Sequence, residues 1–191
     1  RAPAGAAAAR HIPEVDAAIA FAAPWVSPDG EAASPLILGA FELAMVEHLA
    51  DRRFDAAIVF TVCTQSALPA ALMCRLAGIP LRLGYSRENP YALLTEWLPE
   101  TDVVGADMRH EVARQLALVA AVGLHSGDER LHFCYRIEDA HRLHERLLAA
   151  GHDPRRPYFV VHPGASAPSR RYPAEWFGVA AGSLEVVLED V

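Results

Sequence analysis

The feature that most constrains the fold is a nearly uninterrupted apolar run in residues 54–62, FDAAIVFTV, which has the length of one strand. A strand with one face in water alternates polar and apolar residues, and this run does not. Both of its faces must therefore be covered. That requirement is typical of a parallel sheet flanked by helices, so the run predicts an α/β fold.

The neighbouring segments fit the same architecture. Leu36–Arg53 is predicted to be a helix, because apolar residues recur there at intervals of three and four. Ser66–Ala77 is predicted to be a second helix, with Ser66 as its N-cap and Gly78 as its stop. Strands are expected before and after these helices, at Val15–Phe21 and Ile79–Tyr85. Alternating helices and strands with short links indicate a doubly wound, Rossmann-like sheet.

The second half of the chain contains fewer strand signals. Residues 86–106 read as irregular, and residues 107–122 as a helix whose core face holds Met108, Val112, Leu116 and Val119. A link with a short strand is expected at 125–135 and a helix at 138–150. Pro154 and Pro157 mark a domain boundary. Beyond it we expect a strand at Tyr158–His162, a helix from Ala174 and a last strand at Leu184–Val191.

The domain organisation follows from that boundary. Residues 1–153 are expected to form one α/β domain, and residues 154–191 a linker and the beginning of a second Rossmann-like domain. Such a domain needs on the order of 100 residues to bury both faces of its sheet. We therefore expect the second domain to be truncated, and the first residue, Arg1, indicates a missing upstream piece.

Composition excludes several classes of protein. The 191 residues carry a net charge of −7, which argues against a nucleic-acid partner. No apolar run is long enough for a stable membrane span, and no secretory signal is present. The three cysteines, Cys63, Cys74 and Cys134, form no close pairs, so a reducing, cytoplasmic compartment is expected.

Residues 161–173, VHPGASAPSRRYP, are the segment most suggestive of chemistry. A strand is predicted to run into a loop that carries Ser166, Ser169 and Arg170, and a helix follows. Backbone N–H groups, hydroxyls and a guanidinium can together hold phosphate oxygens. A solvated surface loop is the alternative, and the residues alone leave both interpretations open.

This segment resembles the interdomain signature of glycosyltransferase family 9, the heptosyltransferases: HPGAS-x-PS-[KR]-R-[WY]-P, followed here by Glu175 and Trp176-Phe177. The preceding segments are similar to the family in the same order. They comprise the strand, helix and LAG-x-x-x-R-x-G stretch that ends at Gly84, the loop RENPY, and the helix RHEVARQLALVAAVG. The resemblance covers roughly residues 12 to 180.

The resemblance implies a GT-B architecture, in which two Rossmann-like domains face a cleft. The donor domain would bind the diphosphate of a nucleotide sugar through Arg170, which stands where family members usually carry a lysine, with Ser166 and Ser169 lining the same site. The acceptor side would include His110, Arg114 and Arg87.

Each acceptor-side assignment has a plainer alternative. Positions 110 and 114 share a helix face, so the two side chains can form a surface pair that binds nothing. Arg87 can form a salt bridge with Glu88 inside its loop, and the residues favour that interpretation. His141 and His144 are three apart on a helix, but their spacing fits no standard zinc site, and no metal is expected.

The predicted reaction is an inverting transfer of a sugar, expected to be heptose from an ADP-linked donor, to a saccharide acceptor in cell-surface glycan or lipopolysaccharide synthesis. It would need no cofactor. The family's opening Gly-Asp loop, with its presumed base, and its late D-[ST]-G-x-x-H segment lie outside this sequence, so the chain alone is expected to be inactive. The alternatives are a non-catalytic remnant or sugar-nucleotide-binding module, and an unrelated Rossmann-type oxidoreductase.

Overall fold

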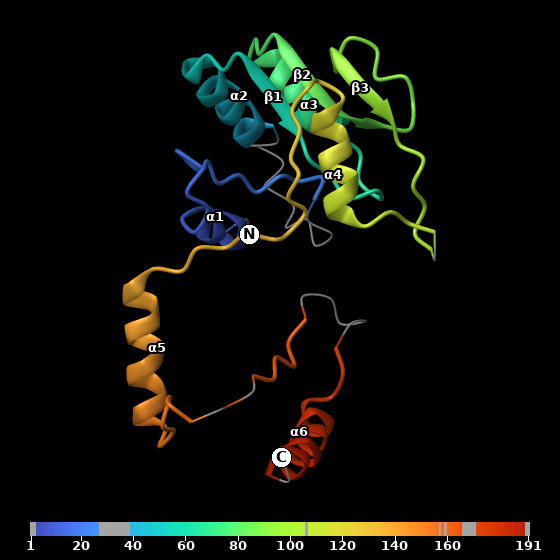
Figure 1. Cartoon of the computed structure of the whole chain (residues 1–191). Helices are drawn as coiled ribbons and strands as arrows, with labels where there is room; N and C mark the ends of the chain where they lie inside the picture. The colour runs from blue at the N-terminus through green and yellow to red at the C-terminus, as the bar shows by residue number, and fades with distance from the viewer. Residues whose placement is uncertain are drawn as a thin grey trace. The chain divides into compact units, whose positions relative to one another are not determined.

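A computed structural model describes residues 3–26, 39–105, 107–156, 158, 160–165 and 171–189. The chain divides into two compact units, Arg1–Cys134 and Tyr135–Val191 (Figure 1). The first unit contains helices α1 (Pro3–Ala9), α2 (Ala40–Arg52), α3 (Leu68–Leu76) and α4 (Glu111–Ala120), and strands β1 (Ala56–Val59), β2 (Leu81–Ser86) and β3 (Glu96–Pro99). The second contains helices α5 (Ile137–Ala149) and α6 (Ala174–Glu189).

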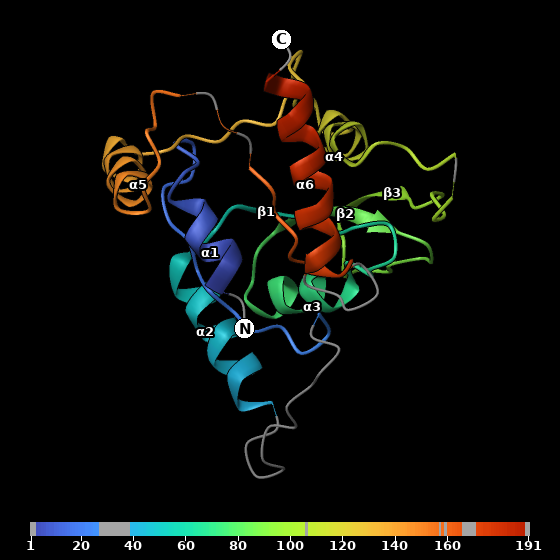
Figure 2. The same cartoon turned by 90° about the horizontal axis from the view of Figure 1, so that it is seen from below.

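The three strands form one parallel sheet in the order β1-β2-β3 (Figures 1 and 2). Ile58 pairs with Leu83 across the first ladder, and Tyr85 pairs with Leu98 across the second. Because all strands run the same way, their carboxyl ends meet at one edge of the sheet. The expected α/β fold with a parallel sheet is confirmed.

Helices cover the two faces of β2. Leu83 and Tyr85 point to one face, where they form a buried core with Leu118 of α4. Gly84 points to the other face, toward Ala67 beside α3 and toward Leu94. The apolar run around β1 is covered only in part, because Ala56 is exposed, Ala57–Val59 are half-buried, and Phe60 and Val62 beyond the strand are exposed.

Arg82 and Gly84 of the LAG-x-x-x-R-x-G stretch have structural roles here. The buried Arg82 guanidinium donates to the backbone carbonyls of Ile79, Pro80, Ala92 and Leu93, so it holds the loop between β2 and β3. A side chain at Gly84 would place its Cβ 3.2 Å from the Cβ of Ala67 and 3.4 Å from Leu94. Only glycine fits at that position without displacing either neighbour.

The helix predictions were correct in type: α2, α3 and α4 are shorter than predicted, α5 is shifted by one residue, and α6 begins at Ala174 as expected. The N-cap of α3 is Ala67, and Ser66 instead accepts a hydrogen bond from the Leu68 N–H at 3.2 Å. Positive φ angles at Gly78, Gly123 and Gly151 follow α3, α4 and α5, as expected for glycine stops. The predicted core face of α4 was wrong, because the residues buried on this helix are Arg114 and Leu118.

Several strand predictions were wrong. Val15–Phe21 forms no strand, and neither does 125–135, where Cys134 instead donates one backbone hydrogen bond to His11. Residues 184–189 belong to α6, because Leu and Glu continue a helix more readily than the two valines among them favour a strand. Strand β3 was missed because Glu96–Pro99 is short and lies between polar residues.

The second unit shows two helices among its described residues. Tyr158 and residues 160–162 lie in no strand. A strand needs a neighbour to satisfy its backbone groups, and no strand is described in this unit that could supply one. The domain boundary at 153/154 and the second Rossmann-like domain stay predictions.

We predict that Gly84→Val will lower the free energy of unfolding by about 1–3 kcal/mol, because its methyl groups would overlap Ala67 and Leu94 in a packed layer. The measurement is chemical denaturation. Gly127→Val is the control, since a Cβ at Gly127 meets nothing within 4 Å. Equal stability of the two variants would contradict the described packing of β2.

Candidate functional site

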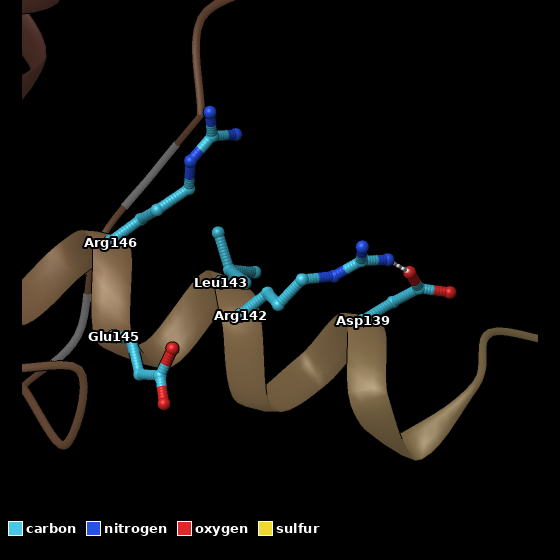
Figure 3. A pocket seen from close by; sticks show the side chains of 5 residues that line it. All are labelled: Asp139, Arg142, Leu143, Glu145 and Arg146. Atoms are coloured by element: carbon cyan, nitrogen blue, oxygen red, sulfur yellow. Dashed lines mark hydrogen bonds and ion pairs between the residues drawn. The ribbon is translucent and has the colours of Figure 1, made fainter.

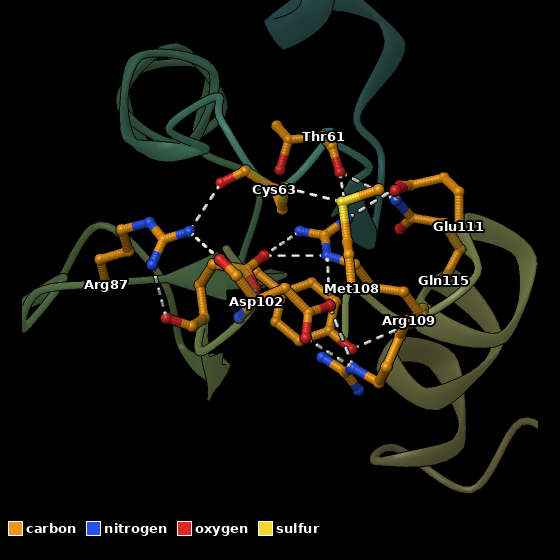
Figure 4. Close-up of polar contacts among 11 residues, drawn as sticks. Thr61, Cys63, Arg87, Asp102, Met108, Arg109, Glu111 and Gln115 are labelled. Atoms are coloured by element: carbon orange, nitrogen blue, oxygen red, sulfur yellow. Dashed lines mark hydrogen bonds and ion pairs between the residues drawn. The ribbon is translucent and has the colours of Figure 1, made fainter. Parts of the chain in front are cut away.

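Several polar side chains lie close together at the carboxyl edge of the sheet. Thr61 and Cys63 follow β1, Arg87 follows β2, and Glu100 and Asp102 follow β3. Figure 4 draws the polar contacts among residues of this edge and of the N-terminal part of α4. In open α/β sheets, ligands bind outside the carboxyl ends of the strands. We therefore take this edge as the candidate site, and we call its residues the edge cluster: Thr61, Cys63, Tyr85, Arg87, Glu100, Asp102, Met108, Arg109, Glu111, Arg114 and Gln115.

Arg114 is the centre of the edge cluster and is fully buried. Its Nε donates to Glu100 Oε2 at 2.9 Å, and its Nη2 donates to the same oxygen. Its Nη1 donates to Glu111 Oε1 at 2.9 Å and to the Thr61 carbonyl. One side chain therefore joins the segment after β1, the segment after β3 and its own helix.

The charge of Arg114 is compensated where it lies. Burial lowers the pKa of its guanidinium, but hydrogen bonds to Glu100 and Glu111 and the charges of both carboxylates raise the pKa by more. The net pKa therefore lies above the usual arginine value, and Arg114 stays charged. Its guanidinium also lies 4.3 Å from the centre of the Tyr85 ring, and the Tyr85 hydroxyl donates to its backbone carbonyl at 2.8 Å.

Asp102 is shared by two arginines. Both of its carboxylate oxygens lie 3.0 Å from Arg109 Nε, and one lies 3.8 Å from Arg114 Nε. Its backbone N–H donates to Glu100 Oε1 at 2.9 Å, so the two acidic residues after β3 hold each other in place. The hydrogen bond and charge of Asp102 raise the pKa of Arg109.

Arg87 ties the strand ends together through backbone groups. Its guanidinium donates to the carbonyls of Cys63 at 3.0 Å and Glu100 at 3.3 Å, and also to that of Asp102. The salt bridge with Glu88 that the sequence favoured is not among the ion pairs of the described residues. Arg87, which follows β2, thus connects the segments after β1 and β3 by hydrogen bonds to their backbone carbonyls.

His110 is the N-cap of α4. Its Nδ1 accepts the backbone N–H of Val112 at 3.3 Å, and the residue is exposed. Arg114 lies one turn further along the helix and is buried, so the two do not form the surface pair that their spacing allowed. The structure brings Arg87, His110 and Arg114 together at the carboxyl edge, but a ligand-binding role for them remains a prediction.

The predicted donor-phosphate residues Ser166, Ser169 and Arg170 lie outside the described residues. The flanking residues are described: Arg171 Nε donates to the Ala165 carbonyl at 3.0 Å. That bond joins the two described residues that flank this segment. It gives Arg171 a local structural partner within the segment.

A hollow of about 560 Å³ lies beside α5 in the second unit, lined by Asp139, Arg142, Leu143, Glu145 and Arg146 (Figure 3). All of these residues come from one helix, and Arg142 pairs with Asp139 within it. Within the described part of the chain, no three His, Cys, Asp or Glu side chains are grouped so as to hold a metal ion. No helix formed by the described residues has the length and apolar character needed to cross a membrane.

Residues 43–185, well over half of the chain, match the sequence model of glycosyltransferase family 9 (heptosyltransferase). The chain belongs to this family. Comparison with curated proteins and with solved structures found no match. Family membership supports glycosyltransferase activity in general, with a nucleotide-sugar donor and an acceptor as its substrates.

Within this family 9 chain, sequence reasoning missed Glu100, Asp102 and Arg109. The sequence around Glu100 and Asp102 is typical of an exposed acidic loop. No local pattern in it predicts that these two side chains are buried. One signal was available: parallel strands place the residues that follow them at one edge. Recognising β3 would have brought Glu100 and Asp102 beside the N-terminal end of α4.

We predict that Arg114→Met will destabilise this family 9 protein by about 3–5 kcal/mol, because Glu100 and Asp102 would lose a buried counter-ion. Chemical denaturation measures the loss. Arg130→Met is the matched control, since Arg130 pairs with Asp128 in an ion pair that is 87% and 54% exposed; it should unfold with the wild type. A similar small effect in both variants would show that the edge cluster does not anchor α4.

Proposed function

We propose that the protein transfers heptose from an ADP-linked donor to a saccharide acceptor during the synthesis of a cell-surface glycan or lipopolysaccharide. The observation that carries this proposal is the family 9 match over residues 43–185, which includes the loop that carries the predicted donor-phosphate residues. The description of the matching family supplies the heptosyl part of the proposal. The proposal also includes a GT-B arrangement with a second Rossmann-like domain, and a cytoplasmic location.

The proposed chemistry is a direct, inverting displacement. A base takes the proton of the acceptor hydroxyl as that oxygen attacks the anomeric carbon, and the bond to the nucleotide diphosphate breaks. Cationic and hydrogen-bonding groups stabilise the departing diphosphate. In this proposal Arg170 supplies the cation and Ser166 and Ser169 supply hydroxyl groups, whereas no residue of this sequence is assigned as the base.

The edge cluster is proposed to form the acceptor side. Arg87 and Arg114 would act by holding the strand ends, because their guanidinium groups already bond to the protein. His110 would face the acceptor, because it is exposed at the start of α4. This division of roles gives the acceptor a rigid surface at the carboxyl edge of the sheet.

Donor binding tests the proposal directly. Calorimetric titration of the full-length gene product with ADP-heptose, with a UDP-linked hexose and with NAD should give the tightest binding for ADP-heptose. Tight binding of NAD without binding of any nucleotide sugar would favour an oxidoreductase. Preference for the UDP-linked sugar would remove the ADP part of the proposal and keep the transferase.

We predict that Arg170→Ala will weaken donor binding about tenfold or more, because a charge-assisted bond to a diphosphate contributes roughly 1.5–3 kcal/mol. Stability should change by no more than about 0.5 kcal/mol, as is usual for a loop side chain. Calorimetry and thermal unfolding give the two values.

Arg171→Ala is the matched control for this experiment. Arg171 donates to the Ala165 carbonyl, so its loss should affect donor binding less than the loss of Arg170. Unchanged donor affinity in Arg170→Ala would remove that residue from the site. A loss of stability large enough to explain the weaker binding would do the same.

A further inference from the structure

The segment that ends the first unit holds a thiol and an imidazole side by side. The sulfur of Cys134 lies 3.8 Å from Nε2 of His132. His132 is exposed and Cys134 is half-buried, so solvent reaches both side chains. Cysteine and histidine are the residue types that most often bind zinc in proteins, and neither of these two belongs to the edge cluster.

The spacing of the two atoms fits one edge of a tetrahedral zinc site. Zinc binds a cysteine sulfur at about 2.3 Å and a histidine nitrogen at about 2.0–2.1 Å, so a tetrahedral angle places the two ligand atoms about 3.6 Å apart. The observed 3.8 Å needs only a small adjustment of the side chains. A mixed nitrogen and sulfur ligand set favours zinc over calcium or magnesium, which prefer oxygen ligands.

The backbone of Cys134 is already held in place. Its N–H donates to the His11 carbonyl at 2.9 Å, and its carbonyl accepts a hydrogen bond from His11 Nδ1 at 2.9 Å. The ring of Phe133 stacks on that of His11, with their centroids 4.6 Å apart. Because Arg10 donates to His11 Nε2 at 3.1 Å, both ring nitrogens of His11 are in use. His11 therefore supports Cys134 and is not itself a ligand.

One chain supplies two of the four ligands that a structural zinc site takes. The carboxylate of Asp128 is bound by Arg130, through Nε at 2.9 Å and Nη2 at 2.7 Å. The described residues include no group of three potential ligands of this kind that could hold a metal. Two copies of the chain related by a two-fold axis would supply two histidines and two cysteines, which is a closed structural ligand set.

The neighbouring side chains favour a second copy as the source of the missing ligands. Leu131 and Phe133 alternate with the two ligands along the chain and are 88% and 60% exposed. Apolar side chains of this kind are stabilised by burial when two copies meet. The charges are also compatible with a metal ion, because two thiolates neutralise Zn²⁺ and Arg130 is compensated by Asp128.

We propose that His132 and Cys134 form half of a zinc site, which a second copy of the chain completes with the same two residues. Each thiol releases its proton to the solvent when its sulfur binds the metal, and no other covalent bond changes. The site would join two chains at the segment where the first unit ends. It is independent of the proposed transfer reaction, since it uses no residue assigned to donor or acceptor.

The test adds zinc to the metal-free chain of 191 residues in the presence of a reductant and follows its mass by sedimentation velocity. The wild type should change from monomer to dimer, with a single zinc ion bound by each pair of chains. His132→Ala and Cys134→Ser should each lose the zinc-induced dimer. His125→Ala and Cys74→Ser are the matched controls, at an exposed histidine and at a cysteine of α3, and should dimerise like the wild type.

Cobalt and a chelator give two further readings. Co²⁺ in place of zinc should produce the sulfur-to-metal charge-transfer absorption and the visible bands of a tetrahedral complex in the wild type, and Cys134→Ser should lack the charge-transfer band. EDTA should return the dimer to monomer, which distinguishes a metal bridge from a disulfide. Far-UV circular dichroism should be the same in the wild type and both ligand variants.

Several results would overturn the inference. The wild type would stay monomeric in excess zinc, or each chain would bind its own zinc ion without forming a dimer. Zinc-induced dimers that persist in His132→Ala or Cys134→Ser would place the metal elsewhere. A loss of helix signal in both ligand variants would show that the two side chains serve the fold.

Discussion

The buried contact between Arg114 and Glu100 is the interaction on which the carboxyl edge of the sheet depends. A guanidinium with no exposed surface cannot be left without acceptors, so its position dictates where the neighbouring backbone and carboxylates must lie. Glu100 in turn accepts the backbone N–H of Asp102, and Thr61 offers its carbonyl to Arg114. The ends of β1 and β3 and the first turns of α4 are thereby fixed relative to one another.

Two further arginines of the first unit, Arg82 and Arg87, add connections around the same sheet. Arg82 holds the loop that leads into β3, and Arg87 reaches from the end of β2 to carbonyls after β1 and β3. Small parallel sheets have few hydrogen bonds of their own, and this one has three strands. The guanidinium groups of Arg82 and Arg87 each donate to several backbone carbonyls. These bonds connect segments that the few hydrogen bonds between the short strands do not join.

Sequence reasoning found the elements with a strong local signal and missed those defined by tertiary contacts. The apolar run at β1 predicted the parallel sheet of the first unit, and the glycines after α3, α4 and α5 predicted where these helices end. The core face of α4 was misplaced because hydrophobic periodicity cannot predict that an arginine is the buried residue. Val15–Phe21 has the composition of a strand, but a strand also needs a neighbouring strand to pair with. The residues of a single segment do not show whether such a partner exists.

The burial of Arg114 changes how the similarity to family 9 should be interpreted. A motif arginine is readily taken as a ligand-binding group, and its position in the helix RHEVARQLALVAAVG gave that expectation. Here Arg114 bonds to protein acceptors, whereas Arg109, five positions earlier, keeps an exposed guanidinium beside the same carboxylate. The buried Arg114 therefore fixes the positions of Glu100 and Asp102, and its contacts are structural. A buried and fully paired guanidinium of this kind can support a binding surface, because a rigid support removes part of the reorganisation that binding would otherwise cost.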